Sequence, residues 1–486
     1  MSNLSELLPT GGGQNSINFV ATGTLASGQV VALKTDGTIE AISATGIPAA
    51  IGAEEVFNSA QTQSQKMTML TSTKAIVVYQ DTGNSSYGTA CILTVSGSTI
   101  TAGTEVVFES APSNYFTVVS FTETQALVVY ADVGNSGIGT YCLLTISGST
   151  ITAGVPATFM FDSLGFPSGV ALSATQAIVA YMDGGVGSIG AAIIFNLSGS
   201  SISVGTAFYF NSGQIAYSPV ASKLTTTKAM LTFVDGAGSF PNNNYGSAII
   251  LNVVNSSTLA AGTKVVYNSA RTAYNYSDTL TATQAIVAYR DAASPYFGKA
   301  CVLNVSGSTI TVGPVVVFEN AEASQIGVSA LTSSRAVVAY ADGGNSGRGT
   351  YCTLDVSGST ITAGTPIVYN PTVGESVANS TAALTTSTFL VAYGDTGNSS
   401  YGTSIFIETG GSNNTSFIGI TAEAIADTAT GPVNIYGGIS TVQTGLTVAS
   451  DYYVQGNGTL STASASPAIK IGQAISATTI NLKDLT

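Results

Sequence analysis

The sequence predicts an all-β fold, and three observations lead to that prediction. Short segments rich in Val, Ile, Thr and Tyr alternate with Gly, Ser and Asn turns along the 486 residues, which is typical of strands. No Pro interrupts the apolar segments that we expect to be central strands. One phrase, an apolar segment ending in Tyr-x-Asp or Phe-x-Asp, recurs every 51 to 56 residues. A repeat of about 50 residues built only of strands is typical of a β-propeller.

The repeated phrase occurs seven times, which predicts seven blades. Its aromatic residues are Tyr79, Tyr130, Tyr181, Phe233, Tyr289, Tyr340 and Tyr393. Each repeat has room for four strands. In the second repeat we expect them at residues 116–121, 126–130, 140–146 and 150–161, with a tight hairpin turn at Ser147-Gly148-Ser149.

The outer strand of the last blade is expected to come from the other end of the chain. Residues 103–111 give the typical form of an outer strand, and the seventh repeat lacks a copy of it after its third strand, near 403–407. The matching segment, 52–60, precedes the first repeat. We therefore predict that this N-terminal strand closes the propeller and removes an exposed edge.

The two ends of the chain do not fit the repeat. Residues 1–50 and 410–486 contain short strand-like segments with hairpin turns at Asp36-Gly37 and Asn457-Gly458. We predict one discontinuous β-rich domain built from both ends, with the propeller, residues 51–409, inserted into it. Residues 1–15 are expected to form a flexible arm. They have neither a basic segment nor an apolar core, so no signal peptide is expected.

Composition excludes several functions. The net charge is −13 and no basic stripe is visible, so nucleic-acid binding is not expected. Mean hydropathy is +0.36, yet no apolar run reaches the roughly 18 residues that a membrane span needs. The chain has no His, which excludes imidazole catalysis and His-ligated metals.

The four cysteines share one position of the repeat. Cys91, Cys142, Cys301 and Cys352 occupy a third-strand position that is Ile in the other three repeats, which predicts buried free thiols.

A loop of the form Asp-x-Gly-Asn-Ser follows the second strand of four repeats. It starts at Asp81, Asp132, Asp342 and Asp395. One interpretation is a calcium loop, but calcium sites gather several oxygen ligands and each loop here offers one carboxylate. The other interpretation is an Asx turn, in which the carboxylate accepts backbone N–H groups. We favour the Asx turn and expect no metal site.

The irregular loops predict a binding face. They depart most from the repeat around the fourth and fifth copies, at residues 238–245, 271–276 and 294–297. Aromatic rings beside amide groups are suited to saccharides, although the rings could instead cover blade ends or pack between subunits. The candidate ligand-binding residues are Phe240, Asn242, Asn243, Tyr245, Arg271, Tyr274, Tyr276, Tyr296 and Phe297.

Catalytic residues are not evident. The four arginines, Arg271, Arg290, Arg335 and Arg348, do not cluster, and no repeat gains the paired carboxylates of a glycoside hydrolase. We expect a protein that is not an enzyme and has no catalytic residues or cofactor.

The ends of the chain carry a resemblance. The segments 19–25, 28–33, 445–447, 452–454, 458–462 and 470–478 resemble small β domains of bacteriophage tail-fibre, spike and head-decoration proteins. The resemblance implies a structural protein on the virion surface, attached to capsid or tail proteins by its terminal domain and assembled as a homo-oligomer. The propeller would then be displayed for a host-surface glycan or receptor. The alternatives are a secreted or cell-surface bacterial lectin and, less favoured, a glycan-active enzyme.

Overall fold

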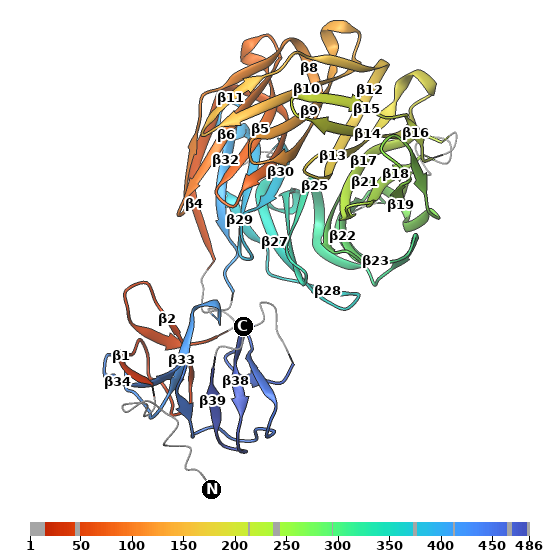
Figure 1. Cartoon of the computed structure of the whole chain (residues 1–486). Coiled ribbons are helices and arrows are strands. Elements are labelled where there is room, and N and C mark those ends of the chain that lie inside the picture. The colour runs from red at the N-terminus through yellow and green to blue at the C-terminus, as the bar shows by residue number, and fades with distance from the viewer. Residues whose placement is uncertain are drawn as a thin grey trace. The chain divides into compact units, whose positions relative to one another are not determined.

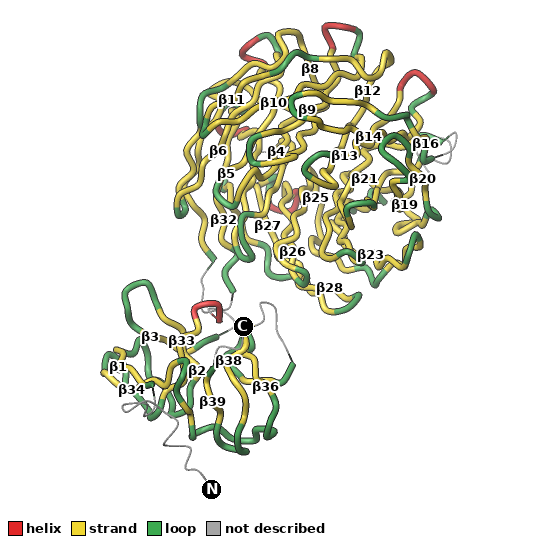
Figure 2. The backbone as a smooth tube through the Cα atoms, viewed as in Figure 1, coloured by secondary structure: helices red, strands yellow, loops and turns green. Residues whose placement is uncertain are grey.

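The computed structural model describes residues 15–43, 49–211, 214–236, 244–293, 295–372, 377–411, 414–463 and 469–483. In these ranges the regular elements are β-strands and short 3₁₀ turns (Figure 2). The chain forms two compact units, unit 1 with Met1–Ala50 and Glu408–Thr486, and unit 2 with Ile51–Ile407 (Figure 1). In the part of the chain that the structure describes, no helix is long and apolar enough to cross a membrane.

Unit 1 consists of two five-stranded sheets, with strand orders β1-β34-β33-β2-β3 and β35-β39-β38-β36-β37. The strands of the first sheet are β1 (Ser16–Val20), β2 (Val30–Leu33), β3 (Ile39–Ala41), β33 (Phe417–Thr421) and β34 (Thr430–Ile435). Those of the second are β35 (Ile439–Ser440), β36 (Asp451–Val454), β37 (Leu460–Ser461), β38 (Ile469–Ala474) and β39 (Ile480–Leu482).

The two sheets of unit 1 have the same topology. In each, a hairpin (β2–β3 or β36–β37) is followed by a second hairpin (β33–β34 or β38–β39) that pairs with its first strand. The turns of the first hairpins also match, because Asp36 Oδ1 accepts the Thr38 N–H at 3.0 Å and Asn457 Oδ1 accepts the Thr459 N–H at 3.1 Å. Only a short connection joins β37 to β38, whereas the whole of unit 2 lies between β3 and β33. Unit 2 is therefore inserted into one copy of a duplicated sheet.

Unit 2 contains the seven sequence repeats. The second strands of the repeats are β5 (Lys74–Asp81), β9 (Gln125–Asp132), β13 (Gln176–Asp183), β18 (Lys228–Asp235), β22 (Gln284–Asp291), β26 (Arg335–Asp342) and β31 (Thr388–Asp395). The third strands are β6 (Tyr87–Ser96), β10 (Ile138–Ser147), β14 (Ile189–Ser198), β19 (Tyr245–Val253), β23 (Phe297–Ser306), β27 (Arg348–Ser357) and β32 (Tyr401–Glu408). All pair antiparallel with their sequence neighbours, so each repeat is a small twisted sheet.

The outer strand of a repeat differs from the prediction. Residues 150–161 are not one strand, because the outer edge is split into two pieces that both pair with the third strand. The bend lies at Gly154-Val155-Pro156, where Pro156 has no N–H to give to the ladder. The first pieces are β7 (Thr99–Ala102), β11 (Thr150–Ala153), β15 (Ser201–Val204), β20 (Leu259–Ala261), β24 (Thr309–Val312) and β28 (Thr360–Ala363).

The second outer piece runs into the first strand of the next repeat. The predicted loop at residues 271–276 is therefore wrong, since it lies inside one continuous strand that pairs with both repeats. The continuous strands are β4 (Ala50–Thr71), β8 (Val106–Thr122), β12 (Ala157–Ser173), β21 (Val265–Thr281) and β25 (Val316–Thr332). In two repeats the passage is interrupted, giving β16 (Phe208–Tyr209) with β17 (Ala216–Thr225) and β29 (Ile367–Asn370) with β30 (Val377–Ala383).

Tilted and edge-to-face contacts between aromatic rings join each repeat to the next. The buried Tyr or Phe of the repeated phrase packs on an aromatic ring of the preceding outer strand, with ring centroids 5.1 to 5.7 Å apart. That second ring covers a glycine of the third strand, as Phe159 covers Gly139, where an added Cβ would lie 2.9 Å from the ring. The outer-strand rings are Phe57, Phe108, Phe159, Phe210, Tyr267, Phe318 and Tyr369.

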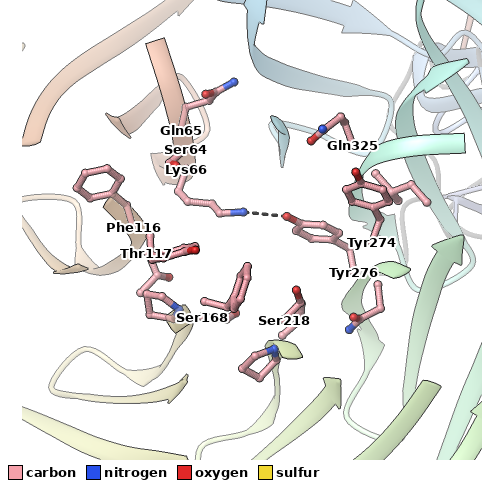
Figure 3. A pocket seen from close by; sticks show the side chains of 17 residues that line it. Ser64, Gln65, Lys66, Phe116, Thr117, Ser168, Ser218, Tyr274, Tyr276 and Gln325 are labelled. Atoms are coloured by element: carbon pink, nitrogen blue, oxygen red, sulfur yellow. Dashed lines mark hydrogen bonds between the residues drawn. The ribbon is translucent and has the colours of Figure 1, made fainter. Parts of the chain in front are cut away.

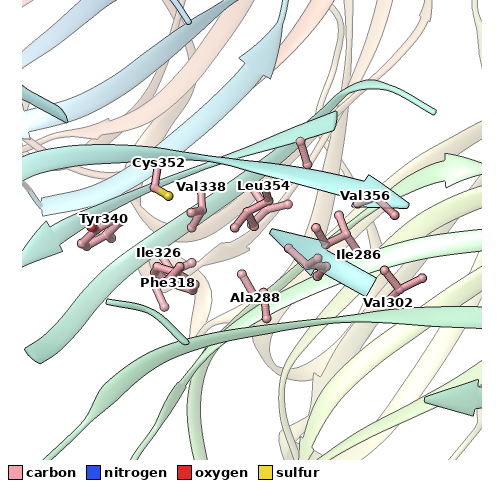
Figure 4. Close-up of a cluster of buried hydrophobic side chains, with 14 of the residues drawn as sticks. Ile286, Ala288, Val302, Phe318, Ile326, Val338, Tyr340, Cys352, Leu354 and Val356 are labelled. Carbon is pink, nitrogen blue, oxygen red and sulfur yellow. The ribbon is translucent and has the colours of Figure 1, made fainter. Parts of the chain in front are cut away.

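The core of unit 2 lies between successive repeats. Among the described residues, seven apolar clusters each combine side chains of two repeats. Figure 4 shows one of them, in which Ile286 and Val302 of the fifth repeat face Val338 and Leu354 of the sixth. Another cluster contains Val77 of the first repeat and Leu390 of the last.

The beginning and end of unit 2 lie side by side. Strand β4, orange in Figure 1, is hydrogen-bonded to β32, in light blue. The Tyr393 hydroxyl donates to Glu54 Oε1 at 2.7 Å, and Ser380 Oγ accepts the Met67 N–H at 3.0 Å. The ladders nevertheless fall into two sheets, of 16 and 13 strands, and neither is closed on itself.

The cysteines are buried free thiols, which confirms the prediction. Each thiol for which a hydrogen bond is resolved donates to backbone carbonyls, as Cys142 Sγ does to Gly154 O at 3.4 Å. Burial raises the pKa of Cys91 and of Cys352 to about 12 and that of Cys142 to about 11.

The predicted Asx turn forms after Asp81, Asp342 and Asp395, whereas the prediction is wrong for Asp132, whose side chain makes no such hydrogen bond. Asp81 Oδ1 accepts the Asn84 N–H at 3.2 Å, and Asp342 Oδ1 accepts the Asn345 N–H at 3.1 Å. An Asp residue of the repeated phrase stands at the start of each described 3₁₀ turn of unit 2. These turns are Thr82–Asn84, Val133–Asn135, Gly184–Val186, Gly343–Asn345 and Thr396–Asn398, and a further one in unit 1 is Asn414–Ser416.

Candidate functional site

In six repeats a β-bulge marks the point where the first strand of the repeat, its inner strand, begins. The residue there has a positive φ, which is uncommon for any side chain and strained for an aromatic one. The register of the strand shifts at the same point, as between Ala273 and Tyr276 in β21. The six residues are Ser64, Tyr115, Phe166, Ser218, Tyr274 and Gln325, with φ between 45° and 55°.

These six residues surround one cavity of about 340 Å³. Inner strands of six successive repeats therefore contribute to a single site, as Figure 3 shows. The cavity is lined by Ser64, Gln65, Lys66, Tyr115, Phe116, Thr117, Phe166, Pro167, Ser168, Ser218, Pro219, Val220, Tyr274, Asn275, Tyr276, Gln325 and Ile326.

The cavity offers flat apolar surfaces. Tyr115 and Phe166 contact each other, with ring centroids 4.8 Å apart and planes tilted by 55°. Tyr115 keeps 38% of its surface exposed, so its ring is accessible. The rings of Tyr274 and Tyr276 come from β21 and line the same cavity. Such rings can stack on the apolar face of a bound molecule.

Polar groups are placed among the rings. Lys66 Nζ donates to the Tyr276 hydroxyl at 2.9 Å and lies 5.0 Å from the centre of that ring (Figure 3). Asn275 is fully buried, and its Oδ1 has no hydrogen-bond partner among the described residues. A buried acceptor without a partner costs free energy, which a ligand donor would relieve.

One arginine packs on two tyrosine rings next to the cavity. The Arg290 guanidinium carbon lies 4.6 Å from the Tyr274 ring centre and 5.4 Å from that of Tyr296. Its Nη1 is 2.7 Å from Glu322 Oε1, which fixes its direction. Arg290 helps to hold Tyr274 in position, because its guanidinium forms both the ion pair with Glu322 and the cation–π contact with the Tyr274 ring.

The predicted site residues are brought together only in part. Tyr274 and Tyr276 line the cavity, and Tyr296 joins Tyr274 through Arg290. Tyr245 and Arg271 lie opposite each other in the β19–β21 pair. Phe297 faces Glu322 across β23 and β25, while Phe240, Asn242 and Asn243 lie outside the described residues.

Sequence reasoning missed the other half of the site. Lys66, Tyr115 and Phe166 belong to repeats that appear regular, and none of them was a candidate. The sequence did contain an indication of these residues. The three positions that begin each inner strand vary between repeats, whereas the Tyr-x-Asp phrase that follows them is nearly constant. These positions read Ser-Gln-Lys at 64–66, Tyr-Phe-Thr at 115–117 and Tyr-Asn-Tyr at 274–276.

Two further features bear on ligands. Among the described residues no group of three or more His, Cys, Asp or Glu could hold a metal ion.

Unit 1 has an open polar cavity of about 580 Å³ near Gln443 and Tyr452. The Tyr452 hydroxyl accepts the Thr447 N–H at 2.8 Å.

Comparison with known proteins gives similarities of fold alone. The sequence matches no family model and no curated protein. Among solved structures, the BP39L lectin from Burkholderia pseudomallei is 11% identical, with a TM-score of 0.51, over 72% of this chain and 97% of that one. A protein of unknown function from Dyadobacter fermentans (10% identity, TM-score 0.42) covers 74% of this chain and 100% of its own. Sqt1 from Chaetomium thermophilum, bound to the N-terminus of ribosomal protein L10 (10%, 0.45), covers 70% and 86%. Its own strands and the similarity to the lectin give the chain an all-β, propeller-like fold.

Proposed function

We propose that unit 2 is a closed seven-bladed β-propeller that binds a saccharide in the cavity between its inner strands. This cavity is called the axial cavity below. The observation that carries this proposal is the cavity itself, to which six repeats contribute at one repeat position. Its rings, at Tyr115, Phe166 and Tyr274, would stack on the apolar face of a sugar. Its amides, at Asn275 and Gln325, would bond hydroxyl groups.

Closure of the ring is supported by contacts between the first and last repeats. They share an apolar cluster of the kind that joins every other pair of neighbours. The hydrogen bond between Ser380 Oγ and the Met67 N–H has equivalents inside the unit, such as Thr117 Oγ1 with the Gly169 N–H at 2.9 Å. Strand β4 then supplies the outer strand of the seventh blade beside β32.

The function is that of a lectin-like binding protein without cofactor or catalytic step. One protein of similar fold is described as a lectin, which agrees with the proposal but at 11% identity does not support a shared ligand. The chemistry of the cavity is the stronger support. It combines aromatic rings, of which Tyr115 is exposed, with amide groups, and among the described lining residues there is no pair of carboxylates.

A glycan array followed by calorimetric titration tests this proposal. The chain has no Trp, so heat is a more direct readout than intrinsic fluorescence. Replacing both Tyr115 and Tyr274 by Ala should lower affinity for the selected glycan at least about tenfold, since each ring contributes roughly 1 kcal/mol. Phe161→Ala, at a ring 83% exposed and outside the cavity lining, is the matched control. Retention of full affinity by the double variant would refute the site.

Attachment to a virus particle is a second proposed function, and it concerns unit 1. The observation that favours it is that both chain ends, which resemble attachment domains of virion proteins, build one unit with its own core. In this proposal unit 1 binds capsid or tail proteins as a homo-oligomer and displays the propeller to a host-surface glycan on the outside of the virion. Mass spectrometry of purified particles tests it, and absence of the protein from every particle fraction would reject it.

A further inference from the structure

Among the described residues that line the axial cavity there is one cation and no anion. The chain carries a net charge of −13, yet among the 17 residues that line the axial cavity none is Asp or Glu and one is Lys66. Among the described residues Lys66 forms no ion pair, and its hydrogen bond goes to the neutral Tyr276 hydroxyl. A partly buried ammonium without a counter-charge is unfavourable.

Two other lysines of unit 2 each have a carboxylate partner. Lys264 forms an ion pair with Asp235, and Lys299 forms one with Asp291, both with N–O distances of 2.5 Å. Lys66 also has no structural need to be cationic, because the same repeat position is Thr117 in the second repeat. The fold therefore tolerates a neutral side chain where this lysine stands.

A nearby carboxylate does not neutralise Lys66. Asp278 lies two residues beyond Tyr276, but it does not line the cavity. Its oxygens accept the Thr279 N–H at 2.7 Å and the Ala330 N–H at 2.9 Å, so it is engaged with backbone groups of two strands. Its role is to tie neighbouring inner strands together.

Asn275 adds a second, independent requirement. Its side chain is fully buried against the cavity, and Oδ1 has no partner among the described residues. An acceptor in this position is satisfied by an O–H or N–H donor of a ligand. The cavity thus offers a cation and an unpaired acceptor beside the accessible Tyr115 ring.

We propose that the axial cavity selects an acidic saccharide, a uronic or sialic acid. The carboxylate accepts from Lys66 Nζ, a hydroxyl donates to Asn275 Oδ1, and the sugar ring packs on Tyr115. This inference rests on the proposed saccharide-binding function and adds the class of sugar. It assigns specificity to Lys66, which no other repeat reproduces.

Matched ligands test the inference. Binding of the full chain to oligoglucuronate is compared by calorimetry with binding to its carboxyl methyl ester, which keeps the sugar and removes the charge. We expect the acid to bind about tenfold more tightly or better, because hydrogen bonds to charged groups are the stronger ones. We expect this preference to weaken in high salt. A sialylated glycan and its desialylated form provide the second pair.

Variants separate the two proposals. Lys66→Gln should remove the preference for the acid while keeping residual binding of the ester, and Lys66→Arg should restore part of it. Lys74→Gln, at a lysine that donates to Gly148 O and does not line the cavity, is the control. Equal affinity for acid and ester overturns the inference and leaves saccharide binding intact. If the protein binds none of the four ligands, the inference is rejected. If the glycan array is negative as well, the proposed saccharide-binding function is also rejected.

Discussion

Replacing Phe57 by Ala tests whether the two ends of unit 2 close a ring. Phe57 lies in β4 and is only 3% exposed. Its ring packs on Tyr79 of the first repeat, with centroids 5.2 Å apart, and covers Gly402 of the last. Truncating a buried Phe costs about 3–5 kcal/mol, since apolar burial is lost and a cavity remains.

The matched variant is Phe108→Ala, which removes the same ring between the first two repeats, where Phe108 packs on Tyr130 at 5.4 Å. If residues 52–60 are a structural strand of the last blade, the two variants should lose similar free energies of unfolding. Urea unfolding followed by far-ultraviolet circular dichroism measures both. Phe161→Ala, at an exposed ring, should change stability by no more than about 0.5 kcal/mol. A loss below about 1 kcal/mol for Phe57→Ala beside a full loss for Phe108→Ala would refute the closure.

Three further predictions follow from the fold. Burial raises the pKa of the Cys142 thiol to about 11, whereas a thiol in the unfolded chain has a pKa of about 8.5. The free energy of unfolding should therefore keep its full value below about pH 8.5 and decrease as the pH rises toward 11. Cys142→Ile should make this fall shallower in unfolding curves at pH 8 and 10, and an unchanged slope would contradict the assignment. Asp81→Ala should cost about 1 kcal/mol by removing the cap on its loop, whereas calcium or a chelator should leave Tm unchanged in calorimetry. Finally, unit 1 with residues 44–413 replaced by a short Gly-Ser linker should fold alone, because both its apolar clusters lie within the unit. Its dispersed amide NMR spectrum would be the evidence, and a spectrum of an unfolded chain would count against it.

Much of unit 2 could be read from the repeats. The Tyr-x-Asp phrase predicted the buried second strands, because an apolar segment with one repeated ending has the same environment in every copy. The Asx turn after Asp81 and the buried thiol of Cys91 were predicted for the same reason. These features depend on residues near in sequence, and local chemistry is enough to specify them.

The axial site could not be predicted in this way. Lys66 and Tyr276 are separated by 210 residues and meet only because six inner strands converge on one cavity. Tyr274 was expected in a loop, but the bulge that turns it into the cavity occurs within a continuous strand. A left-handed residue in a strand leaves no clear pattern in the side-chain alternation, so its direction was decided by tertiary pairing.

The all-β class, the seven repeats and the separate character of the two chain ends could be predicted before the fold was known. Those properties follow from hydrophobic patterning, which acts along the chain. The tertiary structure alone decided which repeat positions face the cavity. It also decided that the strands of unit 1 form two sheets of one topology, the first of them interrupted by unit 2. The cavity and the first sheet of unit 1 depend on contacts between residues hundreds of positions apart, and such contacts become favourable only when the whole fold brings the strands together.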